Sequence, residues 1–157
     1  MIRRFTGLFL ALAFLAGCSG IKAYRDAPVK NLVVRSDVDS GSMFSSMRAG
    51  LDVYRVETGC RTQYEGTVRL DRPSVEVGLP SDRLSYLVFT FEGSSFLGGS
   101  SSATSAGMLL KPRAGYRYEA AVSYREDIYD VVIRELDPRR GASREIPHRD
   151  LEACNNP

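Results

Sequence analysis

The chain has 157 residues, a length that fits a single domain with an adequate hydrophobic core. Charged residues make up 25% of it, and 21 lysines and arginines nearly balance 19 aspartates and glutamates. A balance this even argues against nucleic-acid binding, which needs a surplus of positive charge.

A short basic and apolar stretch opens the chain. Arg3 and Arg4 supply positive charge, and the apolar run from Phe5 to Ala16 is interrupted only by Thr6 and Gly7. The run is shorter than the roughly 20 apolar residues that a transmembrane helix needs. The pattern therefore predicts a secretory signal peptide.

The tetrapeptide at residues 15–18, Leu-Ala-Gly-Cys, closes this run and resembles the lipobox of bacterial lipoproteins. The resemblance implies that the Cys18 thiol receives a diacylglycerol and that the bond between Gly17 and Cys18 is cut. Two or three acyl chains would anchor the protein stably, because each buried methylene contributes about 0.8 kcal/mol. Ser19 stands where an aspartate would mark retention in the inner membrane, so the resemblance favours the periplasmic face of the outer membrane. A plain signal peptide with a chance cysteine is the alternative.

Cleavage would divide the chain into a signal peptide (1–17), a lipidated tether (18–29) and a single β domain (30–157). It would leave equal numbers of basic and acidic residues, because the signal peptide contains two arginines and no acid. The tether is poor in apolar residues and contains glycine and proline. We therefore expect a flexible coil that holds the domain roughly 15 to 20 Å from the lipid.

With Cys18 assigned to lipid, Cys60 and Cys154 remain in an oxidising compartment, where pairing is the default. We predict a disulfide between them, which in the chain-entropy model would stabilise the fold by about 4 to 5 kcal/mol. A redox-active pair is the alternative reading, but the spacing is not Cys-x-x-Cys.

Short runs of alternating apolar and polar residues separated by turn formers fill the mature chain, which predicts β-strands. Leu84–Phe91 carries hydrophobic side chains on both faces, as a central strand does, and Tyr116, Tyr118 and Tyr124 are assigned to the core. The predicted fold is an all-β, antiparallel β-sandwich of about seven to eight strands, immunoglobulin-like or transthyretin-like, with a small barrel as the alternative. The predicted strands are Asn31–Arg35, Leu51–Val56, Thr62–Leu70, Val75–Leu79, Leu84–Phe91, Ala103–Leu110, Tyr116–Arg125, Ile128–Leu136 and an edge strand at Arg144–Pro147.

Two polar stretches interrupt this pattern. Residues 36–46 predict a surface loop, and their partial likeness to a calcium loop fails because Arg48 stands where a glutamate ligand belongs. Gly93–Gly107 is rich in glycine and serine and predicts a flexible linker or loop. Alternatively, it is a binding loop in which an exposed Phe96 and Leu97 contact a partner or lipid.

The inventory for catalysis is small. His148 is the single histidine, and a Ser-His-Asp arrangement with Asp150 is possible only if the fold brings a serine to it. No Gly-x-Ser-x-Gly motif is present, and a zinc site usually needs several His or Cys ligands. An arginine-rich C-terminal region, from Arg134 to Arg149, is interleaved with acids and predicts exposed ion pairs. We expect no enzyme, cofactor or metal.

These expectations describe a binding protein of the bacterial envelope. The first hypothesis is an outer-membrane-anchored periplasmic lipoprotein that serves as a structural or accessory module and docks onto an envelope protein. The alternative is a lipoprotein inhibitor or ligand binder that acts on periplasmic enzymes or cell-wall fragments. An envelope hydrolase is a weaker third option, and no nucleic-acid partner is expected.

Overall fold

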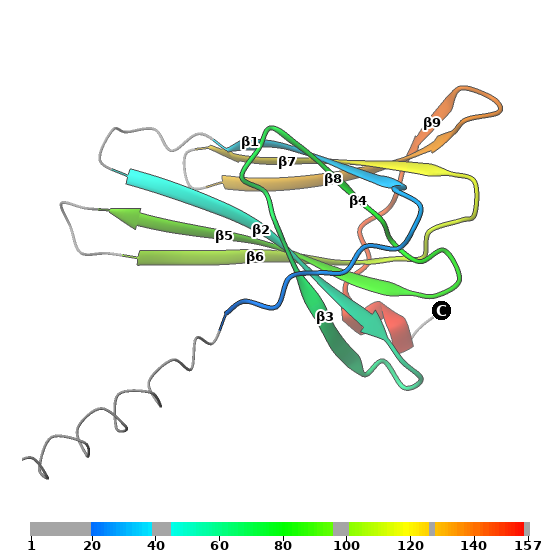
Figure 1. Cartoon of the computed structure of the whole chain (residues 1–157), viewed down its shortest axis with the longest axis horizontal. Helices are drawn as coiled ribbons and strands as arrows, with labels where there is room; N and C mark the ends of the chain where they lie inside the picture. The colour runs from blue at the N-terminus through cyan, green and yellow to red at the C-terminus, as the bar shows by residue number, and fades with distance from the viewer. Residues whose placement is uncertain (1–19, 39–44, 96–100, 126–127, 156–157) are drawn as a thin grey trace, which may run out of the picture.

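Two β-sheets pack face to face in the computed structural model, which describes residues 20–38, 45–95, 101–125 and 128–155 (Figure 1). The strands are β1 (Leu32–Val38), β2 (Ser45–Val56), β3 (Thr62–Arg69), β4 (Ser74–Val77), β5 (Ser85–Ser95), β6 (Ser101–Leu110), β7 (Arg117–Arg125), β8 (Ile128–Asp137) and β9 (Ala142–Glu145). A five-stranded sheet has the order β4-β1-β7-β8-β9, and a four-stranded sheet has the order β3-β2-β5-β6. The two separate sheets confirm the predicted sandwich and exclude its closed alternative.

One strand pair differs from the all-antiparallel prediction. Strand β1 runs parallel to β7, with Leu32 opposite Tyr118 and Val38 opposite Tyr124. Parallel neighbours need a long crossover, and here the connection runs through the other sheet and β4. Alternation along single strands indicates which side chains are buried, but it does not indicate strand direction.

The core fills the space between the sheets with side chains from alternate strand positions. In β5, Leu87, Phe89 and Phe91 are buried, while Tyr86 and Val88 on the other face are partly exposed. Tyr118 is fully buried, as predicted, whereas Tyr116 and Tyr124 are partly buried and pack against the core. The largest fully buried side chains are Tyr118, Phe89, Phe91, Leu32, Leu51, Leu79, Leu87 and Ile133.

The segment predicted as a flexible coil is packed on the domain where the structure describes it. Ala23 forms a parallel bridge with Thr67 of β3, which is flanked by backbone hydrogen bonds from Thr67 to Lys22 (2.8 Å) and from Tyr24 to Thr67 (3.0 Å). Further on, the Ala27 amide donates to the Gly78 carbonyl at 2.9 Å. The prediction of a flexible coil is wrong for these residues. The edge of the sheet supplies hydrogen-bond partners for this short segment, and the composition of the segment alone does not reveal them.

The Gly/Ser stretch is also more ordered than predicted. Strand β5 continues to Ser95 and β6 begins at Ser101, with Gly93 opposite Ser102 in an uninterrupted antiparallel register. The predicted strand at Ala103–Leu110 is therefore confirmed, and the loop prediction is wrong for residues 93–95 and 101–102, where cross-strand pairing extends both strands beyond what composition suggests. Phe96 and Leu97 lie outside the described residues.

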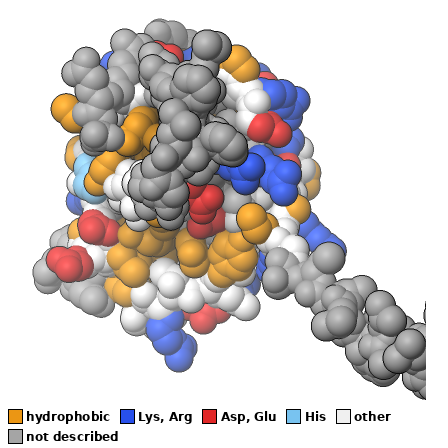
Figure 2. Space-filling model, turned by 90° about the vertical axis from the view of Figure 1, so that its left-hand side faces the viewer, with side chains coloured by type: hydrophobic (Ala, Val, Ile, Leu, Met, Phe, Trp, Pro, Cys, Tyr) orange, Lys and Arg blue, Asp and Glu red, His pale blue; other side chains and the backbone are white. Residues whose placement is uncertain are grey.

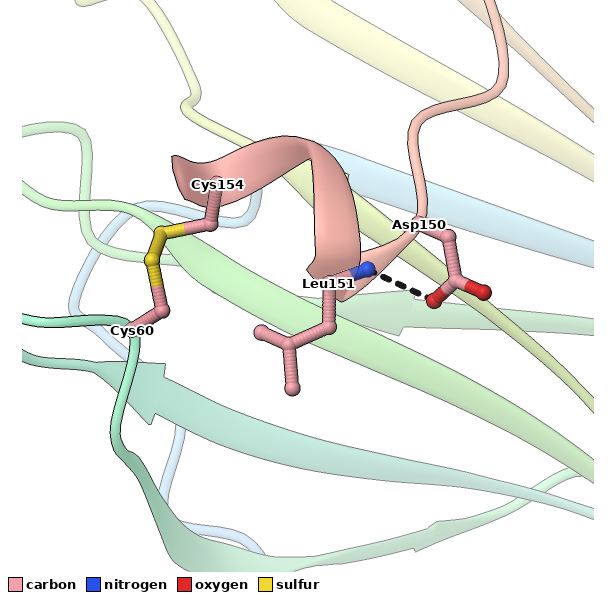
Figure 3. Close-up of a disulfide and its surroundings, with 4 residues drawn as sticks. All are labelled: Cys60, Asp150, Leu151 and Cys154. Carbon is pink, nitrogen blue, oxygen red and sulfur yellow. Dashed lines mark hydrogen bonds between the residues drawn. A yellow bond between two sulfur atoms is a disulfide. The ribbon is translucent and has the colours of Figure 1, made fainter. Parts of the chain in front are cut away.

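The predicted disulfide between Cys60 and Cys154 is present, with the two Cα atoms 5.9 Å apart (Figure 3). Cys154 belongs to a 3-10 helix at Leu151–Asn155, and Cys60 lies in the turn between β2 and β3. The bond therefore fixes the C-terminal segment against the four-stranded sheet. No helix in the described part of the chain is long and apolar enough to cross a bilayer.

Candidate functional site

A groove of about 900 Å³ lies on the outer face of the four-stranded sheet, and we call it the sheet-face groove. Strands β2, β3 and β5 supply most of its lining, and Ile21 of the N-terminal segment is also part of it. A volume of this size is typical of ligand sites. The lining residues used below are Arg48, Gly50, Asp52, Tyr54, Tyr64, Thr67, Arg69, Thr90 and Glu92.

Three tyrosines form a row across the sheet at one end of this groove. Tyr54 of β2 lies opposite Tyr64 of β3 and Tyr86 of β5, with ring centroids 5.4 and 6.2 Å apart. Burial raises the pKa of Tyr54 and of Tyr86, and a hydrogen bond to Asp150 adds to the rise at Tyr86. Tyr64 is 36% exposed, so part of the row is open to a ligand.

Hydrogen bonds hold Tyr64 in place. Its hydroxyl lies 2.6 Å from the Thr67 hydroxyl, which in turn donates to the Asp52 carboxylate. The Lys22 ammonium lies 6.0 Å from the centre of the Tyr64 ring. The N-terminal segment, β3 and β2 thus all position one exposed aromatic ring.

The other end of the groove carries charges of both signs. Arg48 of β2 lies opposite Glu92 of β5, and Arg69 of β3 lies opposite Gly50. A Cβ atom added at Gly50 would lie 2.9 Å from the Thr90 hydroxyl oxygen. The absence of a side chain at Gly50 therefore leaves room for the Thr90 side chain. It also leaves the middle of the groove free of a further side chain from β2.

Two carboxylates of the groove, Asp52 and Glu92, lie apart along the sheet. Glu92 lies opposite Arg48, which is four positions along β2 from Asp52. At about 3.3 Å per residue, the Cα atoms of these two residues are on the order of 13 Å apart along the strand direction.

A buried carboxylate outside the groove belongs to Glu135 of β8, and its partners come from the neighbouring strands β7 and β9 and from the turn before β7. Glu135 accepts hydrogen bonds from the Tyr118 hydroxyl (2.9 Å) and from the guanidinium groups of Arg144 (2.9 Å) and Arg113 (3.2 Å). Burial raises the pKa of Tyr118 to about 12. The predicted ion pairing of the C-terminal arginines is confirmed for Arg144, but its partner is buried. These contacts satisfy a buried charge, so we assign the cluster to stability.

A second hollow, of about 520 Å³, lies where the N-terminal segment meets the turn before β7. The Asn31 side chain crosses it with two hydrogen bonds of 2.8 Å to the backbone of Leu79. The Arg113 guanidinium stacks 3.9 Å from the centre of the Tyr116 ring. Two of its polar side chains, Asn31 and Arg113, are thus already engaged by neighbouring groups of the chain.

One end of the sandwich carries partly exposed hydrophobic side chains. Tyr129, 40% exposed, stacks on Phe91, which also stacks on Tyr124, with ring centroids 5.7 and 5.9 Å apart. Ile128 beside them is 71% exposed. Figure 2 shows this end, where hydrophobic side chains lie between acidic and basic ones.

Within the described part of the chain, no hydrogen bond joins His148 to Asp150 or to a serine. His148 is exposed, and the Asp150 carboxylate accepts hydrogen bonds from the Tyr86 hydroxyl (3.1 Å) and the Leu151 amide (2.6 Å, Figure 3). Asp150 therefore anchors the C-terminal segment to β5. The described residues contain no group of three or more His, Cys, Asp or Glu side chains that could hold a metal ion.

Gly17 and Cys18, together with Phe96 and Leu97, lie outside the described residues. The sheet-face groove is thus built from residues that the sequence analysis did not select as a site. The one signal for it was the outward-facing alternation of Arg48, Gly50, Asp52 and Tyr54 along β2. The chain matches no protein-family model, and searches of the curated proteins and of the solved structures find no similar protein.

Proposed function

We propose that this protein is a lipid-anchored module of the bacterial envelope that docks onto an envelope protein through the sheet-face groove. The observation that carries the proposal is that the groove includes Ile21, which lies close in sequence to the lipobox cysteine. The five Cα-to-Cα steps from Cys18 to Ala23 span at most about 18 Å. An acylated Cys18 would therefore hold the groove near the membrane surface.

The composition of the groove supports recognition of a protein surface. Tyrosine and arginine are enriched at the energetic centres of interfaces, and the groove offers both. The mixture of Arg48, Arg69, Asp52 and Glu92 favours a partner with complementary charges in a fixed register.

A binder of cell-wall fragments is the second candidate, and the tyrosine row favours it. Exposed ring faces stack on the flat faces of sugars, and neighbouring carboxylate, guanidinium and hydroxyl groups satisfy sugar hydroxyls. Tyr64, Asp52 and Thr67 supply such a set in one connected network.

The test begins with the protein purified from bacterial membranes. Its intact mass should correspond to residues 18–157 plus acyl chains, and an unacylated chain would refute the anchor. Crosslinking in the same membranes should then give a stoichiometric protein partner. Tyr64→Ala should lower its recovery about tenfold, which corresponds to about 1.4 kcal/mol.

Tyr129→Ala is the matched control, because Tyr129 is similarly exposed but lies outside the groove. Equal loss with both variants would refute a role for the groove. If no protein is recovered and solubilised wall fragments bind the wild type but not Tyr64→Ala, the second candidate replaces the first.

A further inference from the structure

Four strands lie at sheet edges, and three of them are protected against pairing with another chain. Strand β3 is bridged by Ala23, and its pairing with β2 contains a register shift between Val53 and Tyr54. Strands β4 and β9 have four residues each, and β9 carries Arg144 and Glu145. Short length, charge, irregularity and cover are the devices by which proteins block their sheet edges.

Among the residues that the structure describes, none of these devices protects the fourth edge strand, β6, over most of its length. It has ten residues and pairs with β5 without a register shift. Its first seven residues, 101–107, are Ser-Ser-Ala-Thr-Ser-Ala-Gly and include no charge and no proline. Near its end, the C-terminal segment covers the strand at Leu109, whose amide donates a hydrogen bond to the Arg149 carbonyl at 2.7 Å.

The bond at Leu109 identifies which backbone groups face outward. In an antiparallel pair, alternate residues direct both their amide and carbonyl to the same neighbour. Since Leu109 directs its amide away from β5, Gly107, Ser105, Ala103 and Ser101 direct theirs to the same open edge. Figure 1 shows β6 at the outer edge of its sheet.

We propose that this open edge pairs with β6 of a second copy of the same chain, antiparallel and about a two-fold axis at Thr104. This register would place Ala103 opposite Ser105 of the second copy and Ser101 opposite its Gly107. All of these residues have outward-facing backbone groups, as a hydrogen-bonded ladder requires. Leu109 would lie just beyond the paired stretch, so its bond to Arg149 would remain.

The side chains favour a second copy over a foreign peptide. Strand addition gains specificity from pockets for alternate side chains, and small Ser, Ala and Gly residues provide no such pockets. The symmetric pair brings no like charges together and places Thr104 beside Thr104 of the second copy, a favourable cross-strand pair. An interface of one strand is small, so we expect a reversible dimer that membrane attachment would strengthen by concentrating the chains.

A cysteine at the axis tests the proposal in the full chain, expressed in bacteria and oxidised in isolated membranes. Non-hydrogen-bonded antiparallel partners have Cα atoms about 4.5 Å apart, a distance that a disulfide spans. Thr104→Cys should therefore give a reducible band of twice the monomer mass as the main product. Ser143→Cys, on the charged edge strand β9, and the wild type should remain monomeric.

The register is tested with two further variants. Ser102→Cys should not link to itself, because its expected neighbour is residue 106 of the second copy, but it should link to Ala106→Cys when the two are co-expressed. Monomeric Thr104→Cys would overturn the proposal, and so would a link from Thr104→Cys to a different protein. Self-linking of Ser102→Cys as efficient as that of Thr104→Cys would overturn the register. These outcomes do not depend on the groove.

Discussion

The two edges of the four-stranded sheet are completed in different ways. At the β3 edge, the N-terminal segment adds backbone hydrogen bonds, and glycine makes room for it: a Cβ at Gly66 would lie 2.5 Å from the Tyr24 nitrogen. At the β6 edge, the C-terminal segment contacts Leu109 and leaves residues 101–107 open. One edge is therefore closed by the chain itself, while the described residues leave most of the other edge without a further backbone partner.

The disulfide connects these two edges, since it joins the turn before β3 to the segment that covers the end of β6. Replacing both Cys60 and Cys154 by serine should lower the free energy of unfolding by about 4 kcal/mol, because the unfolded chain regains the freedom of a long loop. Urea denaturation measures this change. Cys18→Ser is the control and should unfold like the wild type, whereas a loss below about 1 kcal/mol in the double variant would contradict the prediction.

Gly66→Ala tests the closed edge. Gly66 has φ +146°, and its missing Cβ leaves room for the backbone of Ala23 and Tyr24, so alanine should expel the N-terminal segment. We expect a loss of about 3 kcal/mol from backbone strain and from the lost hydrogen bonds. Hydrogen exchange should show lost protection around residues 22–27 and unchanged protection in β6.

Gly59→Ala is the matched control, because Gly59 also has positive φ (+75°) but open space around it. It should cost only the strain, about 1 kcal/mol. If Gly59→Ala and Gly66→Ala lose the same stability and the N-terminal segment stays protected in both, the contact is not what stabilises this edge.

Alkaline pH tests the packing of the same N-terminal segment with a smaller perturbation, through a contact with the residue after β4. Tyr24 donates a hydrogen bond to the Gly78 carbonyl, and burial, followed by the nearby Glu65, raises its pKa to about 12 from 10. A raised pKa means that the folded state retains this proton longer than the unfolded state does. The stabilisation is therefore complete below pH 10 and is lost as pH rises to about 12, at a rate of up to about 1.4 kcal/mol per pH unit.

Unfolding free energies measured from pH 8 to 12 would show this dependence. Tyr24→Phe should lose about 1 kcal/mol at pH 8 and then fall less steeply than the wild type. Tyr118→Phe is the comparison in the other sheet, because the pKa of Tyr118 is also raised to about 12, chiefly by burial. An unchanged slope in Tyr24→Phe would show that this hydroxyl does not stabilise the covered edge.

The sequence by itself determined the fold class and most strands, because burial of one sheet face imposes a period of two on each strand. Alternation from Tyr116 to Arg125 and from Thr62 to Leu70 predicted β7 and β3 closely. The disulfide followed from there being two cysteines left after Cys18 was assigned to lipid. The lipobox and the envelope function stay predictions of the sequence.

Only the tertiary structure decided which strands are neighbours. The features that the sequence analysis did not predict all result from this strand pairing. The sheet-face groove unites Tyr54, Tyr64 and Glu92 from three strands, and the N-terminal segment became ordered because β3 is a sheet edge. Residues 93–95 and 101–102 extended the predicted strands because β5 and β6 satisfy each other's backbone groups. The period-two pattern of apolar residues indicates which side chains of a strand are buried. Strand pairing depends on contacts between residues far apart in the sequence, which no local pattern indicates.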